Sequence, residues 1–178
     1  MLVDGKNVKG VMLEKDAIRR TLARIAHEII EHNDNLSNLV IIGIKTHGVP
    51  LANRIQKFIE DFENIKVPTD YLDTSDFRDD LLEKNHIAPK FNFDIKDKDI
   101  ILVDDVLYTG RTVRAGIEAI MEAGRPSSIQ LAVLVDRGHR QLPFRADYVG
   151  KNIPTSHQEQ IELKLEEIDG IDVVYLLG

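Results

Sequence analysis

The feature that most constrains this chain is the stretch from Ile100 to Thr112. An uninterrupted apolar run, Ile100 to Val103, ends in two adjacent carboxylates, and a small hydroxyl-rich turn then opens a helical pattern. Such a run is typical of a strand buried on both faces, so the pattern predicts a parallel sheet with Asp104 and Asp105 at its carboxyl edge. Because open α/β sheets bind ligands at that edge, we expect a site there.

The turn that follows the two carboxylates has the chemistry of an anion site. Residues 109–112, Thr-Gly-Arg-Thr, place backbone N–H groups and hydroxyls at the beginning of the expected helix. Gly110 lets the backbone close around a phosphate without a Cβ in the way. Carboxylates for hydroxyl groups and amides for a phosphate together indicate a ribose 5-phosphate. The alternative is that Asp-Asp merely ends a strand and Thr-Gly merely starts a helix.

The complete pattern, with Asp-Asp and Thr-Gly-x-Thr at a fixed offset, resembles the phosphoribosyl pyrophosphate (PRPP) motif of type I phosphoribosyltransferases. We therefore favour the ligand-binding interpretation. The PRPP-binding residues that the resemblance implies in this turn are Val106, Leu107, Tyr108, Thr109, Gly110, Arg111 and Thr112. Tyr108 modestly favours a pyrimidine, because purine-specific enzymes of related pattern typically place an Asp there.

The remaining pattern predicts an α/β fold, an open and mostly parallel sheet of about four or five strands with helices on both faces. Pro68 suggests that its strand is an edge strand or has a bulge. Helices are expected over residues 15–32, 51–62 and 113–123, the last ended by Gly124, and strands over 39–44, 65–72, 100–103, 129–135, 146–149, 161–165 and 173–177.

Composition is that of a single globular domain. The 178 residues suit one domain, 1–178, with 43% hydrophobic and 30% charged residues. The chain has no cysteine, which excludes disulfides and thiolate metal sites and is neutral about compartment. It has no membrane-length apolar stretch and no signal-peptide core at its start, so we expect a cytoplasmic protein without a membrane partner. A net charge of −7 argues against bulk attraction to nucleic acid, but a local basic face can still bind it.

A second turn follows the strand expected at 39–44. Residues 43–48 read Gly-Ile-Lys-Thr-His-Gly, and the candidate pyrophosphate-binding residues are Lys45, Thr46, His47 and Gly48. Alone this signal is weak, because strand–turn–helix junctions often contain Gly and Thr. It gains weight because both turns are expected at the same edge of one parallel sheet.

Further segments carry a closer resemblance. They are residues 17–20 (AIRR), 24–28 (RIAHE), 43–46 (GIKT), 77–81 (FRDDL), 124–128 (GRPSS), 135–140 (VDRGHR) and 150–155 (GKNIPT). Together with the PRPP motif they resemble the bacterial family of bifunctional pyrimidine operon regulators and uracil phosphoribosyltransferases, over roughly residues 14–156. The resemblance implies a type I phosphoribosyltransferase fold. The weak pattern of residues 73–98 predicts a mobile loop there, and the tail is expected to form a small cap, or hood, over the crevice.

This resemblance implies displacement of pyrophosphate from PRPP by uracil, giving UMP. Asp104 and Asp105 would hold the ribose hydroxyls, stabilise positive charge on the ribose, and bind Mg²⁺ indirectly through those hydroxyls or water. Arg78, the third catalytic candidate, would close over the pyrophosphate. Arg137 and Asp136 are expected to bind substrate.

Two positions near the expected phosphate site depart from the family pattern. His47 stands where Arg is usual, and Phe77 where Tyr is usual. The first departure removes a permanent cation beside the leaving group, so it bears on catalytic strength.

Basic residues are concentrated after Val106, and Arg20, Arg24 and His27 form one polar stripe on the first expected helix. Such a stripe alone is usually a solvated helix face. The resemblance implies instead that it contacts a messenger-RNA leader hairpin, with UMP or UTP as effector. The expected RNA-binding residues are Arg20, Arg24, His27, His139, Arg140, Arg145 and Lys151.

Three hypotheses stay open: a bifunctional regulator, a phosphoribosyltransferase alone, and an RNA-binding nucleotide sensor with little catalysis. His47 is the best argument in the sequence for the sensor. The two carboxylates do not separate these hypotheses, because an enzyme and a sensor both bind a phosphoribosyl group. A homodimer or higher homo-oligomer is expected.

Overall fold

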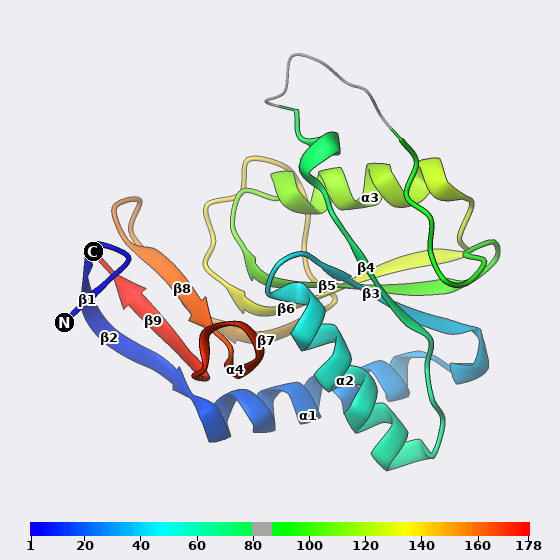
Figure 1. Cartoon of the computed structure of the whole chain (residues 1–178), viewed down its shortest axis with the longest axis horizontal. Coiled ribbons are helices and arrows are strands. Elements are labelled where there is room, and N and C mark those ends of the chain that lie inside the picture. Colours follow the sequence, from blue (N-terminus) through cyan, green and yellow to red (C-terminus); the bar gives the residue numbers. More distant parts are fainter. Residues whose placement is uncertain (80–86) are drawn as a thin grey trace.

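The computed structural model describes residues 1–79 and 87–178 and contains two sheets (Figure 1). The elements are β1 (Leu2–Val3), β2 (Lys6–Glu14), α1 (Lys15–His32), η1 (Leu36–Asn38), β3 (Leu39–Ile44), α2 (Gly48–Glu63), β4 (Thr69–Leu72), η2 (Ser75–Phe77), β5 (Asp99–Leu107), α3 (Arg111–Ala123), β6 (Ser128–Asp136), β7 (Tyr148–Asn152), β8 (Gln160–Lys164), α4 (Glu166–Asp169) and β9 (Val173–Leu177).

The larger sheet is parallel and positions the site. Its strand order is β4-β3-β5-β6-β7, so β5 is the central strand and β4 an edge strand, as Pro68 suggested. Residue Gly43 of β3 pairs with Val103 of β5, and Leu107 of β5 pairs with Asp136 of β6. The carboxyl ends of β3, β5 and β6 therefore lie side by side, and the expected parallel sheet is confirmed.

Alternation within the central strands divides the core into two layers. In β3, Leu39 and Ile41 pack in the cluster that includes α1 and α2, whereas Val40, Ile42 and Ile44 pack in the cluster that includes α3. All of these side chains are buried, which explains the continuous apolar run. The helices cover both faces of the sheet, with α1 and α2 on one and α3 on the other (Figure 1).

The smaller sheet, with α4, forms the hood. Its strands are antiparallel in the order β1-β2-β9-β8 (Figure 1). The tail contributes β8 and β9 to this sheet, and β2 pairs with β9 over Val8 to Glu14, so the N-terminus supplies the other half. The N-terminal strands were not predicted, because Gly10 interrupts the side-chain alternation of β2 and β1 has two residues only.

The loop expected to be mobile, 73–98, includes residues 80–86, which lie outside the described residues. On either side of them, Phe77 and Ile95 are buried in the cluster that includes α3. Mobility of this loop stays a prediction. In the part of the chain that the structure describes, no helix is long and apolar enough to cross a membrane.

Candidate functional site

The two adjacent carboxylates lie near the carboxyl end of β5, and each turns back onto the next amide. The Asp105 N–H donates to Asp104 Oδ1 at 2.9 Å, and the Val106 N–H donates to Asp105 Oδ1 at 2.7 Å. Asp104 is only 6% exposed. Burial, followed by the charge of Asp105, raises the pKa of Asp104 well above its ordinary value. A perturbed carboxyl at this edge of a parallel sheet favours a functional site.

Directly after the carboxylates, the backbone forms a cradle at the start of α3. A cavity of about 80 Å³ is lined by Asp104, Val106 to Gly110, Thr112 and Val113. Gly110 has φ +91°, and a Cβ there would lie 3.2 Å from the Phe144 ring, so glycine is required. The cradle has the size and the N–H groups to hold one phosphate.

A loop after β6 braces this cradle from behind. The N–H groups of Gln141 and Leu142 donate to the Thr109 carbonyl at 2.9 and 3.0 Å. The Arg140 guanidinium donates to the Tyr108 carbonyl at 2.9 Å and pairs with Asp136. Asp136 was expected to bind substrate and Arg140 to bind RNA, but both side chains are engaged within the protein here.

The turn between β3 and α2 packs directly on β5. A Cβ on Gly48 would lie 2.5 Å from the Val103 carbonyl, and a Cβ on Gly43 would lie 2.5 Å from the Gly48 carbonyl. Gly48 is expected to let pyrophosphate approach closely, and this stays a prediction. In the structure Gly48 lets two backbones approach each other, which places the turn beside the carboxylates. The Lys45–Thr46 peptide bond in this turn is cis.

His47 connects this turn to the hood. Its Nδ1 lies 3.7 Å from Asp105 Oδ2, and its Nε2 lies 3.0 Å from Asp169 Oδ2 in α4. Lys45 places its ammonium 4.6 Å from the centroid of the Tyr71 ring. Asp169 was missed by sequence reasoning, since no motif marks it and it is far from His47 along the chain.

Arg78 lies at the same face of the site. A hollow of about 500 Å³ is lined by Arg78, Asp79, Tyr108, Thr109, Arg111 and Thr112. Arg111 pairs with Asp79 across this hollow. The structure therefore brings the expected pyrophosphate arginine next to the cradle.

A second hollow lies between Tyr108 and the hood. Its volume is about 390 Å³, and Val106, Arg137 and residues 157–161 also line it. The buried Arg137 stacks over the Tyr108 ring at 4.0 Å and donates to Thr155 Oγ1 at 3.0 Å and to the Glu159 carbonyl at 2.7 Å. Arg137 thus forms a wall of this hollow.

The residues expected to bind RNA divide into two groups. Arg24 donates to the Gly150 carbonyl at 2.5 Å, and Lys151 donates to the Met12 carbonyl at 3.1 Å, so α1 and β7 meet on one surface. Arg20 and His27 are exposed on the same helix, and Arg145 is exposed in the loop before β7. The other group lies toward the cradle: Arg140 braces it, and His139 contacts the Thr155 carbonyl.

Comparison with known proteins agrees with this geometry. The model of the phosphoribosyl transferase domain matches residues 12–164. The bifunctional protein PyrR of Clostridioides difficile is 58% identical over 171 residues, covering 93% of this chain and 96% of that protein. The bifunctional protein PyrR of Bacillus subtilis is 53% identical over 174 residues, covering 94% and 96%.

Solved structures show the same fold at low identity. A hypoxanthine phosphoribosyltransferase from Staphylococcus aureus superimposes with a TM-score of 0.75 at 20% identity, covering 96% of this chain and 93% of that one. A hypoxanthine phosphoribosyltransferase from Trypanosoma cruzi, in complex with IMP, gives 0.70 at 21% identity, covering 96% and 90%. The chain therefore belongs to the phosphoribosyl transferase domain family and, within it, to the family of bifunctional PyrR proteins.

Proposed function

We propose that this protein makes UMP and pyrophosphate from uracil and PRPP, and that it is also a UMP-responsive RNA-binding attenuator of a pyrimidine biosynthesis operon. The observation that carries the proposal is the Asp104–Asp105 pair on the central strand, directly before the phosphate-sized cradle that opens α3. The high identity to bifunctional PyrR proteins supports both halves of the proposal.

In the transferase reaction, residues 106–112 bind the 5-phosphate and the two carboxylates accept the ribose hydroxyls. Bond breaking at the anomeric carbon builds positive charge on the ribose, and the negative charge of Asp104 and Asp105 stabilises it. Lys45, His47 and the amides of their turn receive the departing pyrophosphate. Arg78 adds a guanidinium at the neighbouring face and favours the charged leaving group.

Mg²⁺ fits this site as a partner of the substrate. Among the described residues no three His, Cys, Asp or Glu side chains gather as a metal site, so a cage made of protein ligands is absent there. Mg²⁺ keeps several waters and is commonly bound through one or two carboxylates plus substrate phosphates. Asp104 and Asp105 would hold it through ribose hydroxyls or water, and when bound it neutralises charge on the pyrophosphate.

Uracil occupies the hollow between Tyr108 and the hood. The stacked pair of Tyr108 and Arg137 supplies a flat wall, and Arg137 is itself fixed by Thr155 and the Glu159 carbonyl. Because these bonds from Nε and Nη2 fix the plane of the guanidinium, Arg137 contributes shape to the base site, and phosphate binding rests on the cradle. A planar base stacks well on such a wall.

The RNA-binding half rests on the surface where α1 and β7 meet. Arg20, Arg24, His27 and Lys151 are exposed there in a chain of net charge −7, so the positive charge is local. Phosphate contacts from such residues give affinity, and unpaired loop bases give selectivity. If UMP tightens hairpin binding, the hairpin tightens UMP binding by the same factor.

One paired experiment tests the proposal. UMP formation from PRPP and uracil is measured with Mg²⁺, and binding of a pyrimidine-operon leader hairpin is measured with and without UMP. Turnover together with UMP-enhanced binding supports the bifunctional protein. Turnover without hairpin binding leaves a phosphoribosyltransferase alone, and hairpin binding without turnover leaves a nucleotide-sensing regulator. Sedimentation in the same buffers tests the expected homodimer or higher homo-oligomer.

A further inference from the structure

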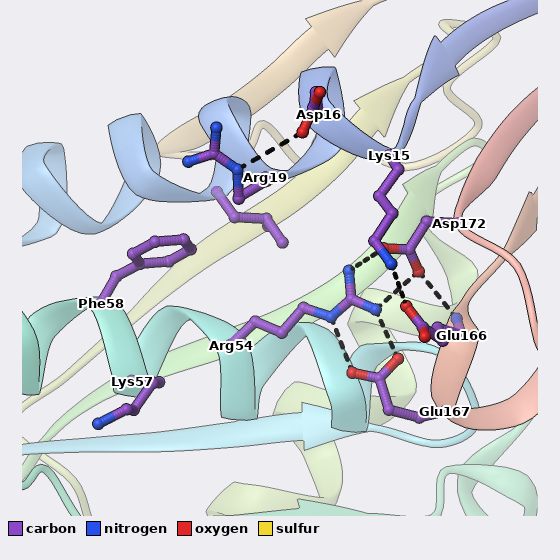
Figure 2. A pocket seen from close by; sticks show the side chains of 10 residues that line it. Lys15, Asp16, Arg19, Arg54, Lys57, Phe58, Glu166, Glu167 and Asp172 are labelled. Carbon is purple, nitrogen blue, oxygen red and sulfur yellow. Dashed lines mark hydrogen bonds and ion pairs between the residues drawn. The ribbon is translucent and has the colours of Figure 1, made fainter.

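Two sets of polar contacts join the hood to α2 and to the turn that precedes it. The first, the Arg54 cluster, consists of Arg54, Glu167 and Asp172, and Figure 2 shows the guanidinium between the two carboxylates. Arg54 donates to Glu167 at 2.6 and 2.8 Å and to Asp172 at 2.7 and 2.9 Å. The second set is the contact between His47 and Asp169 at 3.0 Å.

The Arg54 guanidinium has a carboxylate partner on each side. It borders a cavity of about 460 Å³ whose other cations are also paired, since Lys15 meets Glu166 at 2.6 Å and Arg19 meets Asp16 at 3.8 Å (Figure 2), and Lys57 meets Asp61 at 3.0 Å. The cluster holds the hood against α2, and no hydrogen bond or ion pair among the described residues joins it to Asp104 or Asp105.

The contact between His47 and Asp169 differs, because it reaches the site. The other nitrogen of the ring lies 3.7 Å from Asp105, one of the two ribose-binding carboxylates. The side chains of His47 and Asp169 are 20% and 19% exposed. The ring is therefore mostly enclosed, with one carboxylate at each nitrogen.

Asp169 is itself held in place. Its Oδ2 accepts the Leu165 N–H at 2.8 Å, which closes the first turn of α4. Burial opposes its ionisation, but the Leu165 amide and His47 together hold the pKa of Asp169 below its ordinary value. An ionised carboxylate only accepts hydrogen bonds, so the His47 Nε2 that faces it carries the hydrogen.

We propose that Asp169 of the hood is a positioning residue that holds the His47 ring in the orientation needed for PRPP binding. The inference rests on the proposed function. A ring released from Asp169 has Asp105 as its nearest remaining carboxylate and turns toward it. It then competes with the ribose hydroxyls for that carboxylate and no longer faces the pyrophosphate from a fixed position.

The test measures the Kd of PRPP with Mg²⁺ by calorimetry, beside the KM for PRPP and kcat. Asp169→Ala should weaken PRPP binding about five- to tenfold, the effect of one lost hydrogen bond. Asp169→Asn keeps a carbonyl acceptor for Nε2 and should restore the affinity to within about twofold of the parent. Glu167→Ala, on the same short helix, removes one partner of Arg54 and should leave PRPP binding unchanged.

A double-mutant cycle separates positioning from support of the hood. In the His47→Ala background, Asp169→Ala should cause no further loss of PRPP affinity. A loss that persists without the ring, or an equal loss in Glu167→Ala, overturns the inference. A parent protein that binds PRPP but forms no UMP contradicts the proposed catalysis, whereas the binding cycle still decides the role of Asp169. A parent protein that does not bind PRPP overturns both.

Discussion

The two turns at the carboxyl edge of the sheet are built in different ways. The turn after β5 has a strong local signature: the two carboxylates before it bond to the next amides, Gly110 adopts a positive φ, and α3 begins at Arg111. The loop after β6 supports it from outside through hydrogen bonds to the Thr109 carbonyl. The turn after β3 takes its place from elsewhere. Gly48 rests on the backbone of β5, and His47 is held by a carboxylate of the hood.

This difference explains why the sequence signal of the turn after β5 is strong and that of the turn after β3 is weak. Where hydrogen bonds between neighbouring residues set much of a turn's geometry, the sequence motif of that turn is specific. Where contacts with distant residues hold a turn, its own sequence is ordinary and its position depends on how the chain packs. We therefore expect changes in the first turn to be severe and local, and changes in the second to depend on the hood.

The largest expected effect is at the first turn. Asp104→Asn combined with Asp105→Asn should lower the rate of UMP formation by about 10²–10³, because two ribose contacts and their charge near a cationic transition state are lost. Initial rates at saturating PRPP and uracil measure this loss, and circular dichroism checks the fold. Asp99→Asn, at the amino end of the same strand, is the matched control. Near-normal turnover in the folded double variant would remove the pair from catalysis.

The next effect tests the hood that supports the second turn. Arg54→Gln should lower the free energy of unfolding at pH 7 by about 1–3 kcal/mol, since Asp172 loses its charged partner in a mostly buried position. Urea titration measures the change. Lys57→Gln on the same helix, which loses an exposed pair with Asp61, should change little.

The pH dependence of this loss follows from the carboxylates of the Arg54 cluster. Burial of Asp172 opposes its ionisation, but hydrogen bonds from Arg54 hold the pKa of Asp172 below its ordinary value. A carboxyl whose pKa is lower in the folded state stabilises the protein at pH values above its pKa in the unfolded state. This stabilisation is lost as the pH falls through the pKa of the folded state. The difference between the parent and Arg54→Gln should therefore shrink as pH falls below about 4. A constant difference down to pH 2 would argue against the ion pair.

A smaller effect is expected at the second turn itself. His47→Arg should raise kcat/KM severalfold, up to about tenfold, because a guanidinium is always charged and can bind two phosphate oxygens at once. It should also make PRPP binding less sensitive to Asp169→Ala. Steady-state kinetics of the single and double variants measure both effects. An unchanged kcat/KM would show that position 47 does not contact the leaving group.

The smallest effect concerns a surface that belongs to neither turn. Replacing Arg20 and Lys151 by Gln should flatten the salt dependence of hairpin binding by roughly one unit of slope per lost phosphate contact. Turnover should not change. Arg125→Gln, which alters an exposed arginine outside that surface, is the control. An unchanged slope in the double variant would favour the enzyme without RNA binding.

Arg140→Gln should reduce turnover, because Arg140 donates a hydrogen bond to the Tyr108 carbonyl and so supports the cradle.

Much of the fold was predictable because burial is periodic along the chain. The limits of α1, β3 and β9 agree with the expected ranges, and Gly124 ends α3 as predicted. The expected strand over 65–72 is shorter, since residues 65–68 form a connection that is exposed apart from the buried Val67, and β4 begins at Thr69. The short helix α4 was not expected, because four residues carry no helical periodicity.

Parts of the candidate site could be predicted from the sequence and parts could not. The carboxylates and the cradle were predicted from adjacent residues, whereas the pairing of Arg140 with Asp136 behind the cradle was not. Asp136 stays a predicted substrate-binding residue and Arg140 a predicted RNA-binding residue. In the structure the two residues pair with each other, and Arg140 also reaches the backbone at Tyr108.

The parallel sheet, its central strand and the phosphate cradle could be predicted from the amino-acid sequence, because the continuous apolar runs, the Asp-Asp pair and Gly110 are patterns of neighbouring residues. The residue of the hood that meets His47 could not be predicted, nor could the contribution of the N-terminus to the hood. Pairs such as His47 with Asp169, or β2 with β9, join residues far apart in the chain, and no local pattern records their distance.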